Sequence, residues 1–162
     1  MKAKHVTAQY FPRILNETVS RSEQRIRAEV KRRGYQGAVE LKNASLKVLA
    51  GRRHGKIYKI RNGRTARAHQ ASAAGESPAA MTGALRLSWR ESTTIEEQGK
   101  HMTILSEIES NLKYAGPLEY GRSSGTTKNG KRYGTIAPRP YRQNIQNRAK
   151  PFIIESYGKA YD

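Results

Sequence analysis

The feature of this sequence that most constrains its fold is one helical stripe between Phe11 and Ala50. Small or apolar residues recur there at alternating spacings of three and four. These residues are Leu15, Val19, Ser22, Ile26, Val30, Gly34, Gly37, Leu41, Ala44 and Val48. The spacing predicts one long helix, or two coaxial helices with a hinge at the glycines, because each glycine costs about 1 kcal/mol in a helix. Gly51 suits a C-terminal cap. Such a helix needs a sheet of its own domain or a neighbouring subunit to lie on.

The composition limits the size of the hydrophobic core that this helix and the rest of the chain can form. The chain has 162 residues, the size of one ordinary domain, and 36% of them are hydrophobic. Compact domains reach about 45–50%, although that range also counts glycine. Small chains with few apolar residues often complete their burial by forming oligomers. We therefore expect a single domain over residues 1–162, with a modest core and a tendency to assemble.

The middle of the chain predicts a small antiparallel sheet. Residues 55–60 fit a short strand, and residues 61–64 fit a turn or hairpin tip. Alternation over residues 85–90 predicts a half-buried strand, although Thr82 can instead cap one helical turn before it. Residues 91–99 are the expected connection to a second strand. One face of that second strand carries Met102, Ile104 and Ile108, with Ser106 as an interruption.

The last third of the chain predicts loops and a second helix. Residues 114–121 fit a short helix or turn. Residues 61–80 and 122–138 are polar with little to bury, so we expect exposed loops or arms. A helix is expected to start at Pro140 and to break or restart at Pro151. The predicted fold class is α+β, with a long N-terminal helix, a small antiparallel sheet, a C-terminal helix and long basic loops.

Charge is the strongest compositional signal. There are 31 Lys and Arg against 13 Asp and Glu, a formal net charge of +18, whereas a magnitude of about 2–8 keeps a small domain soluble. Residues 31–67 hold twelve bases and one acid, residues 122–150 hold eight bases and no acid, and residues 76–109 are mildly acidic. This segregation favours directed contact with nucleic-acid phosphates or with the acidic face of a neighbouring copy. The candidate basic patch consists of Lys31, Arg32, Arg33, Arg52, Arg53, Lys56, Lys59, Arg61, Arg64, Arg67, Lys128, Lys131 and Arg132.

The sequence contains no spacing of residues that is typical of a catalytic site or of a metal-binding site. The chain has no cysteine, which excludes disulfides, thiolate metal sites and cysteine nucleophiles. No metal-ligand spacing connects His5, His54, His69 and His101. Residues 121–125 lack the spacing of a serine nucleophile elbow, and there is no phosphate-binding loop. We therefore expect no enzymatic activity, no cofactor and no metal.

No segment has the character of a membrane span or a signal peptide. No run approaches the ~18 apolar residues that a spanning helix needs, and the N-terminus lacks an apolar signal core. We therefore expect a protein that is made in the cytoplasm and does not associate with a membrane.

Three segments carry motifs in a defined order. Residues 73–89 contain Thr-Gly-Ala-Leu-Arg-Leu-Ser, residues 114–121 read Tyr-Ala-Gly-Pro-Leu-Glu-Tyr-Gly, and residues 137–141 read Ala-Pro-Arg-Pro-Tyr. Their key residues are Thr82, Gly83, Leu85, Arg86, Tyr114, Glu119, Gly121, Arg139, Pro140 and Tyr141. Together these three motif segments resemble the signature of the head–tail joining proteins of long-tailed phages, a family of neck or tail-completion components. The resemblance spans about residues 40–145, and Ser77 replaces the first proline of the family's Gly-Glu-Pro-Pro-like loop.

The resemblance implies a structural virion protein at the head–tail junction. It implies a homo-oligomeric ring, a hexamer or dodecamer, which meets neighbouring neck, adaptor, stopper or tail proteins and surrounds the genomic DNA. The basic patch would then face the DNA backbone or an adjacent ring. Within the motif segments, we expect Thr82 to act as a cap and Gly83 to permit a tight turn. Glu119 and Arg139 suit a salt bridge within the fold or between subunits.

The competing class is a free nucleic-acid-binding protein of host or phage. Its isolated monomer would bind tightly, with a steep salt dependence. The chain has no helix-turn-helix or zinc-finger spacing, and its nine tyrosines are scattered. Any contact with nucleic acid would therefore involve the phosphate backbone without base specificity.

Overall fold

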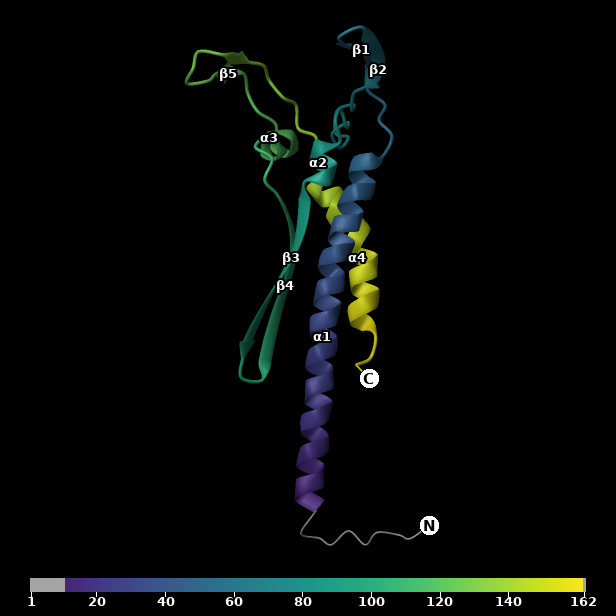
Figure 1. The fold of residues 1–162 in the computed structure, drawn as a ribbon, viewed down its shortest axis with the longest axis vertical. Coiled ribbons are helices and arrows are strands. Elements are labelled where there is room, and N and C mark those ends of the chain that lie inside the picture. The colour runs from purple at the N-terminus through teal and green to yellow at the C-terminus, as the bar shows by residue number, and fades with distance from the viewer. Residues whose placement is uncertain (1–10, 162) are drawn as a thin grey trace.

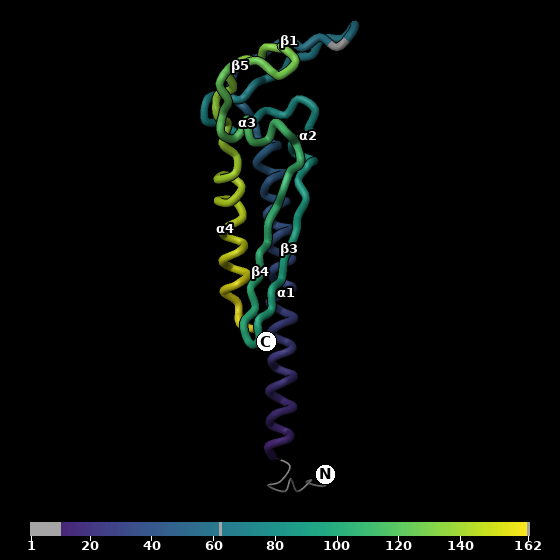
Figure 2. Tube along the Cα trace, turned by 90° about the vertical axis from the view of Figure 1, so that its left-hand side faces the viewer, coloured from purple at the N-terminus to yellow at the C-terminus, as the bar shows by residue number. Residues whose placement is uncertain are grey.

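A long helix forms the axis of the molecule. The computed structural model describes residues 11–161 apart from the side chain of Asn62, and residues 1–10 and 162 lie outside the description. Helix α1 (Phe11–Ala50) is continuous, which confirms the single-helix form of the prediction. Helix α4 (Arg142–Gly158) packs along one side of α1. The hairpin of β3 (Trp89–Gln98) and β4 (His101–Ser110) packs along another side (Figures 1 and 2).

Gly34 and Gly37 of α1 do not form a hinge; they allow β4 to approach the helix. A Cβ atom on Gly34 would lie 2.5 Å from Cγ2 of Ile104, and one on Gly37 would lie 3.7 Å from Oγ of Ser106. The Ser106 hydroxyl donates a hydrogen bond of 2.7 Å to the carbonyl oxygen of Gly34. Ser106, which interrupts the apolar face of β4, therefore contacts the helix backbone directly, because the two glycines have no side chains there.

The C-terminal end of α1 is closed by an arginine side chain. Gly51 is not among the glycines with positive φ, so the glycine cap expected there is wrong. Instead the Arg53 guanidinium donates hydrogen bonds to the carbonyl oxygens of Val48 at 3.0 Å, Gly51 at 2.7 Å and Pro78 at 3.0 Å. The contact with Val48 satisfies a carbonyl group that the end of the helix leaves without a partner, and the contact with Pro78 ties this end to the loop before α2.

The strands form three separate antiparallel pairs within the described residues rather than one small sheet. Strand β1 (Ile57–Asn62) pairs with β2 (Thr65–Gln70) around a turn at Gly63, which has a φ of 60°. Strands β3 and β4 pair over their full lengths. Strand β5 (Gly125–Thr126) pairs with β6 (Arg132–Tyr133). The strand over residues 55–60 is confirmed, whereas residues 61–80, expected as loop, contain all of β2.

The start of β3 differs from the main prediction. Residues 84–87 form the helical turn α2 (Ala84–Leu87), so the helical alternative that starts near Thr82 holds and the strand begins only at Trp89. Residues 91–99 are not a connection, because β3 runs to Gln98 and the chain turns at Gly99. The alternation seen over residues 85–90 is thus the end of one helical turn followed by the first residues of a strand.

The short helix α3 (Ala115–Tyr120) confirms the prediction for residues 114–121. Helix α4 begins soon after Pro140, as expected, but it continues through Pro151, so the predicted break or restart there is wrong. Pro151 has no N–H for the carbonyl oxygen of Asn147. Both residues are exposed, and water can take the place of the missing bond.

The core is small and lies where the four helices meet. Tyr141 is 2% exposed, and its hydroxyl donates a hydrogen bond of 2.8 Å to the carbonyl oxygen of Ala115. Its ring meets that of Trp89 edge to face, with the centroids 5.9 Å apart. The other buried apolar members are Ala44, Leu49, Leu85, Ile145 and Ala149.

The N-terminal part of α1 extends beyond the rest of the molecule (Figures 1 and 2). We call residues 11–26 the stalk. Leu15, Val19 and Ile26 of the apolar stripe are 52%, 57% and 43% exposed there. Farther along α1, Gly34, Gly37 and Ala44 of the same stripe are buried. Among the described residues, the stripe is therefore buried only in its second half.

Candidate functional site at the two-armed end

Two hairpins project from the end of the molecule opposite the stalk (Figure 1). The first arm, residues 55–71, contains β1 and β2 and is closed at its base by a hydrogen bond of 3.0 Å from the N–H of Gly55 to Ala71. The second arm, residues 122–136, contains β5 and β6. Its base is closed by reciprocal backbone hydrogen bonds of 2.9 and 2.7 Å between Arg122 and Ile136. Residues 122–138, expected as an exposed loop or arm, contain this second hairpin.

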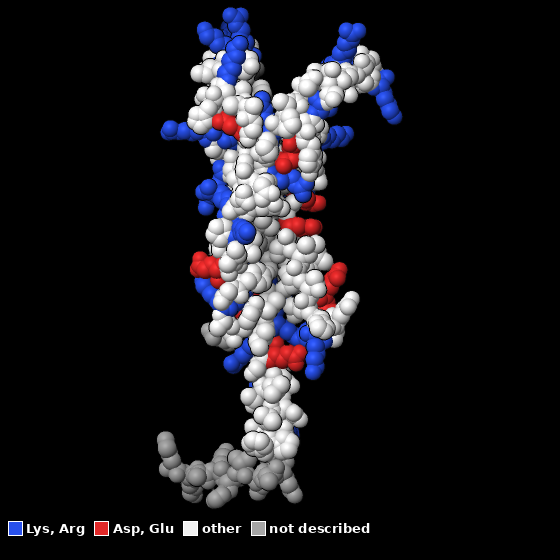
Figure 3. Space-filling model, turned by 180° about the vertical axis from the view of Figure 1, so that it is seen from behind, with Lys and Arg blue, Asp and Glu red and all other residues white. Residues whose placement is uncertain are grey.

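Both arms carry exposed cations without an ion-pair partner among the described residues. Those of the first arm are Lys56, Lys59, Arg61, Arg64 and Arg67, and those of the second arm are Arg122, Lys128, Lys131 and Arg132. Figure 3 shows the blue side chains gathered on both arms, while red ones lie lower on the body. Two of the cations lie against tyrosine rings: Lys56 over Tyr58 at 5.8 Å and Arg122 over Tyr133 at 4.0 Å.

Two other members of the expected basic patch are paired with acidic side chains of the body. Lys31, expected in the basic patch, contacts Glu97 of β3 at 2.6 Å and lowers the pKa of that carboxyl group. Arg32, another expected member, contacts Glu29 at 2.6 Å and is the main cause of a Glu29 pKa of about 2. Both cations therefore belong to the ion pairs of the body and not to a free basic surface.

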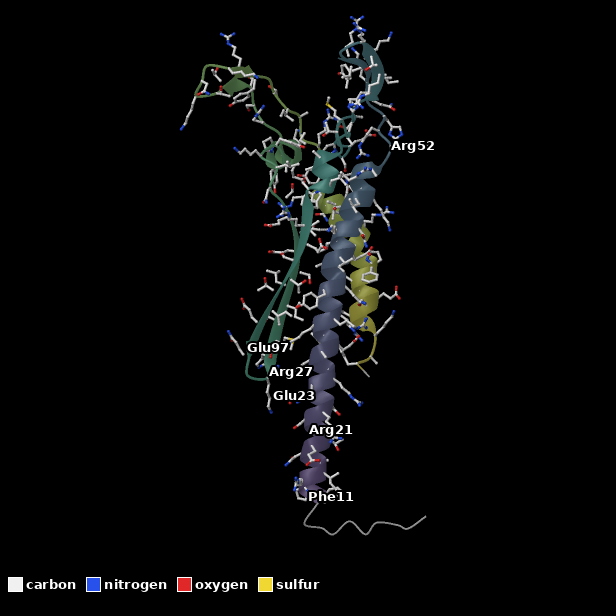
Figure 4. The ribbon with its side chains drawn as sticks, in the orientation of Figure 1. Phe11, Arg21, Glu23, Arg27, Arg52 and Glu97 are labelled. Carbon is white, nitrogen blue, oxygen red and sulfur yellow. The ribbon has the colours of Figure 1, made fainter. Side chains whose placement is uncertain are left out.

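Arg33 was expected in the basic patch, and this is wrong because its side chain is buried. It is 4% exposed and donates hydrogen bonds of 2.7 Å to the carbonyl oxygens of Lys159 and Ala160. Its guanidinium also lies 4.1 Å from the centre of the Tyr161 ring and contacts Glu29 at 2.7 Å. Arg33 thus holds the segment after α4 against α1. Arg53 is likewise a structural group, through its carbonyl contacts at the end of α1, whereas Arg52 beside it is exposed (Figure 4).

The three motif segments meet at the base of the arms. They line one pocket of about 440 Å³ whose walls are largely apolar. The motif residues that line it are Thr82, Gly83, Leu85, Arg86, Tyr114 and Arg139. Segments that are far apart in the sequence therefore form one continuous surface between the two basic arms.

The first motif segment forms the tight turn expected at Gly83, but the N-cap of α2 is Gly83 itself and not Thr82, so the predicted Thr82 cap is wrong. The hydroxyl oxygen of Thr82 accepts a hydrogen bond of 3.3 Å from the N–H of Ala84 at the start of α2. Gly83 has a φ of 79°, a conformation that favours glycine. Leu85 is buried in the core, and Arg86 is half-buried at the pocket.

Glu119 and Arg139 do not form the expected salt bridge with each other within the chain. The Glu119 carboxylate accepts hydrogen bonds from the N–H groups of Tyr141 at 2.8 Å and Arg142 at 3.2 Å. The Arg139 guanidinium donates to the carbonyl oxygens of Ser72 and Ala73. Each side chain is thus bound to backbone, Glu119 at the start of α4 and Arg139 at the loop that follows the first arm.

The remaining motif residues hold the second arm and the start of α4. Gly121 has a φ of 80°, and a Cβ there would lie 3.0 Å from the carbonyl oxygen of Ile136 and from Pro138. The carbonyl oxygen of Pro140 accepts a hydrogen bond of 3.0 Å from the hydroxyl of Ser77 in the first motif segment. Tyr114 is exposed at the pocket.

Glu76 is a site residue that sequence reasoning missed. Its carboxylate accepts hydrogen bonds from the N–H of Ala73 at 2.8 Å and of His54 at 3.1 Å, and it lies 2.6 Å from Nδ1 of His54. These contacts, that of Ala73 first, lower its pKa to about 2. Glu76 therefore ties the base of the first arm to the first motif segment. The signal in the sequence was a single acid within a basic and polar loop.

Neither metal-binding nor membrane-spanning features occur between residues 11 and 161. No group of three or more His, Asp and Glu side chains there is placed to hold a metal ion. In the same range no helix combines the length and the apolar character needed to cross a membrane. His54 and His101 are exposed and His69 is half-buried, whereas His5 lies outside the described residues.

Comparison of the chain with known protein families, curated proteins and solved structures gives no match.

Proposed function

We propose that this protein is a structural component of a phage head–tail connector that forms a homo-oligomeric ring in the neck of the virion. The observation that carries the proposal is the convergence of the three motif segments, which resemble those of neck proteins, around one pocket between the arms. Motifs that are separate in sequence but share one surface are typical of a common role in folding and assembly. Neighbouring adaptor, stopper or tail proteins are the expected partners of this end.

The exposed apolar residues of the stalk support a role for this protein in assembly. The stalk exposes Leu15, Val19 and Ile26 on one face, and among the described residues only the hairpin tip, at Lys100 and Met102, lies beside part of this face. Exposed contiguous apolar surface marks an interaction site in a soluble protein. A subunit of a ring can cover such a surface by contact with the next subunit.

The arms supply a contact for DNA that passes through the ring. Their cations lie on two exposed hairpins and have no ion-pair partner in the part of the chain that the structure describes, so they can neutralise phosphates and release counterions. Isolated two-stranded hairpins have little intrinsic stability, and a bound polyanion would order them. The contact would be independent of base sequence, because it involves the backbone.

The decisive experiment is to determine the mass and shape of the purified full-length protein. We expect closed rings, hexamers or dodecamers, in light scattering and in electron-microscopy class averages. We also expect the protein at the head–tail junction of assembled particles, with the corresponding neck layer lost when its gene is deleted. A stable monomer that is absent from assembled particles would overturn the proposal.

A free nucleic-acid-binding protein is the second candidate, and the unpaired arm cations favour it. It predicts tight binding of the monomer to a 30-base-pair duplex. Replacing Lys128 and Lys131 by alanine would then lower the magnitude of the salt slope by about 2. The matched control replaces Lys113 and Lys150, two exposed lysines outside the arms. If the duplex binds only to assembled rings, the connector role is supported and the free binding protein is excluded.

A further inference from the structure

The pocket between the arms has the size and the walls of a binding site for an apolar side chain. Its volume is about 440 Å³, and Leu49, Leu85 and Leu118 give it apolar walls. Leu49 and Leu85 also belong to the core, so the pocket is built on the most rigid part of the molecule. Met81, which also lines the pocket, is 55% exposed, and methionine adapts readily to the shape of a bound group. Pockets of this size with few polar groups are typical of binding sites.

Arg86 is the polar group of the pocket that most restricts what can bind there. Its side chain is half-buried, and a Cβ on Gly83 would lie 4.0 Å from its Nη2, which places the guanidinium beside the Gly83 turn. This guanidinium forms no ion pair and no hydrogen bond with another described residue. A guanidinium presents its N–H donors in a fixed fork that matches a carboxylate. A ligand with a carboxylate would therefore satisfy donors that the fold leaves free.

Two further side chains offer hydrogen-bonding groups to the same pocket. The imidazole of His69 in β2 and the hydroxyl of Tyr114 before α3 line it, and neither forms a hydrogen bond with another described residue. Arg139 also lines the pocket, but its guanidinium already donates to the carbonyl oxygens of Ser72 and Ala73. No aspartate or glutamate is among the residues that line it. A carboxylate in the pocket would thus meet donors from separate segments of the chain and no like charge.

The position of the pocket favours an acidic protein segment as its occupant. Helices α2 and α3, which contribute to its walls, lie at the base of the two arms (Figure 1). The exposed cations of both arms flank any chain that enters there, and they would attract a segment of negative charge. DNA presents phosphates on its outer surface and has no apolar side chain to fill the pocket. The pocket therefore fits a protein better than it fits a nucleic acid.

A second copy of this chain is poorly supplied with the carboxylate that the pocket would take. Most glutamates of the described residues already form ion pairs, and Glu119 binds backbone N–H groups. The ring contacts between copies and the contact at this pocket are therefore different surfaces. The occupant is a separate, more acidic protein.

We propose that this pocket binds a segment of a neighbouring neck or tail protein in which an apolar side chain stands next to an aspartate or glutamate. The apolar side chain fills the pocket, and the adjacent carboxylate pairs with the guanidinium of Arg86. A large side chain in a pocket that excludes water is the usual centre of a protein contact. The identity of the partner as a neck or tail protein rests on the proposed function, whereas the chemistry of the segment rests on the pocket alone.

Binding of synthetic peptides to the full-length protein tests this chemistry. Biotinylated peptides carry phenylalanine or leucine next to an aspartate in a background of glycine and serine, and biolayer interferometry measures their affinity. Serine in place of the apolar residue, or asparagine in place of the aspartate, is expected to weaken binding roughly tenfold, because each change removes one recognised group. Equal affinity for all these peptides would overturn the proposal.

Substitutions in the protein locate the binding. Arg86→Gln removes the charge of the pocket, and Ala84→Leu fills the pocket from an exposed position that lines it. Each variant is expected to bind the Phe-Asp peptide roughly tenfold more weakly. Arg90→Gln, at an exposed position that does not line the pocket, is the matched control and is expected to keep the affinity of the wild type. Circular dichroism must show native helix content for each variant. Unchanged affinity in both Arg86→Gln and Ala84→Leu would overturn the site.

Two comparisons test the other occupants. Peptides that are held by the arms alone would lose affinity in Lys128→Ala/Lys131→Ala and keep it in Ala84→Leu, and this result would overturn the proposal. Peptides with the sequences of residues 89–98 and 101–110, which hold most of the free glutamates, represent a second copy. Tighter binding of either one than of the Phe-Asp peptide would assign the pocket to a contact between copies and would also overturn the proposal.

Light scattering of the same samples separates this inference from the proposed function. If the wild-type chain forms no ring and is absent from particles, the proposed function fails, and the peptide measurements still decide the chemistry of the pocket. If rings form and no peptide binds, only the pocket proposal fails.

Discussion

The carboxylate of Glu119 accepts a hydrogen bond of 2.8 Å from the backbone N–H of Tyr141 and thereby closes the start of α4. The next N–H, that of Arg142, donates to the same oxygen at 3.2 Å. The first N–H groups of a helix have no acceptor within the helix, so an acid from another segment stabilises them. Because Glu119 precedes the second arm and Tyr141 follows it, this contact also holds together the two ends of that arm.

Removal of this cap is expected to destabilise the fold. Glu119→Ala should lower the free energy of unfolding by about 1–2 kcal/mol, whereas Glu119→Gln keeps an acceptor and should lose less. Urea unfolding monitored by fluorescence of Trp89, the single tryptophan and a neighbour of the Tyr141 ring, measures the change. Glu109→Ala, at an exposed position of β4, is the control and should change stability by less than about 0.5 kcal/mol. Equal losses for Glu119→Ala and Glu109→Ala would contradict the capping role.

The two glycines in the middle of α1 are expected to respond in opposite directions to alanine. At Gly37 the new Cβ would make ordinary contact at 3.7 Å, so Gly37→Ala should stabilise the protein by about 0.5–1 kcal/mol through helix propensity. At Gly34 the new Cβ would lie 2.5 Å from Cγ2 of Ile104, close to the branch point of that side chain. Gly34→Ala should therefore destabilise by about 1–3 kcal/mol. Thermal and urea unfolding of both variants measure the difference.

A double variant identifies the clash as the cause. In a protein that carries Ile104→Ala, the effect of Gly34→Ala should become more favourable by at least about 1 kcal/mol, because the opposing methyl group is gone. The same cost of Gly34→Ala in both backgrounds would assign the effect to the helix itself instead of its packing against β4.

The long helix was predictable because a single stripe keeps its period through the glycines. Whether Gly34 is a hinge or a packing position was not predictable from the helix, because Ile104 decides it from a distant strand. Strand β3 was placed too early in the sequence for a related reason. Its inward residues Glu91 and Glu97 are polar and pair with Lys42 and Lys31 of α1, and such pairs leave no trace in hydrophobic periodicity.

The candidate site was predictable in outline but not in its contacts. Segregation of charge along the sequence identified the residues of both arms. Composition could not separate Arg33, which is buried against Lys159 and Ala160, from arginines that face solvent. Glu119 and Arg139 were expected to form a salt bridge because their charges are opposite. Each side chain instead forms hydrogen bonds with backbone groups of other residues.

Arg33 is expected to anchor the segment that follows α4. Arg33→Ala removes donors to the carbonyl oxygens of Lys159 and Ala160 and should lower the free energy of unfolding by about 2–3 kcal/mol. Arg33→Lys keeps the charge but loses the forked geometry, so it should restore stability only in part. Hydrogen exchange of the last residues should accelerate in both variants. Arg32→Ala, next in sequence but exposed, is the control, and equal effects at both positions would refute the anchor.

Acid is expected to destabilise the fold through carboxylates whose pKa is low in the folded state. The pKa of Glu29 is lowered from 4.5 to about 2, mainly by Arg32, and that of Glu76 is lowered to about 2, mainly by the N–H of Ala73. Because these folded-state pKa values lie below the unfolded value, the stabilisation that the two carboxylates provide is complete above about pH 4.5 and is lost as the pH falls towards 2.

The urea midpoint should therefore stay level from pH 8 to 6 and fall steadily below about pH 5. Glu76→Gln should lower the midpoint at neutral pH and make the decline shallower, whereas Glu109→Gln, at an exposed position without an ion pair, should leave the curve unchanged. An identical acid profile for Glu76→Gln and the wild type would show that the contacts of Glu76 do not contribute to stability.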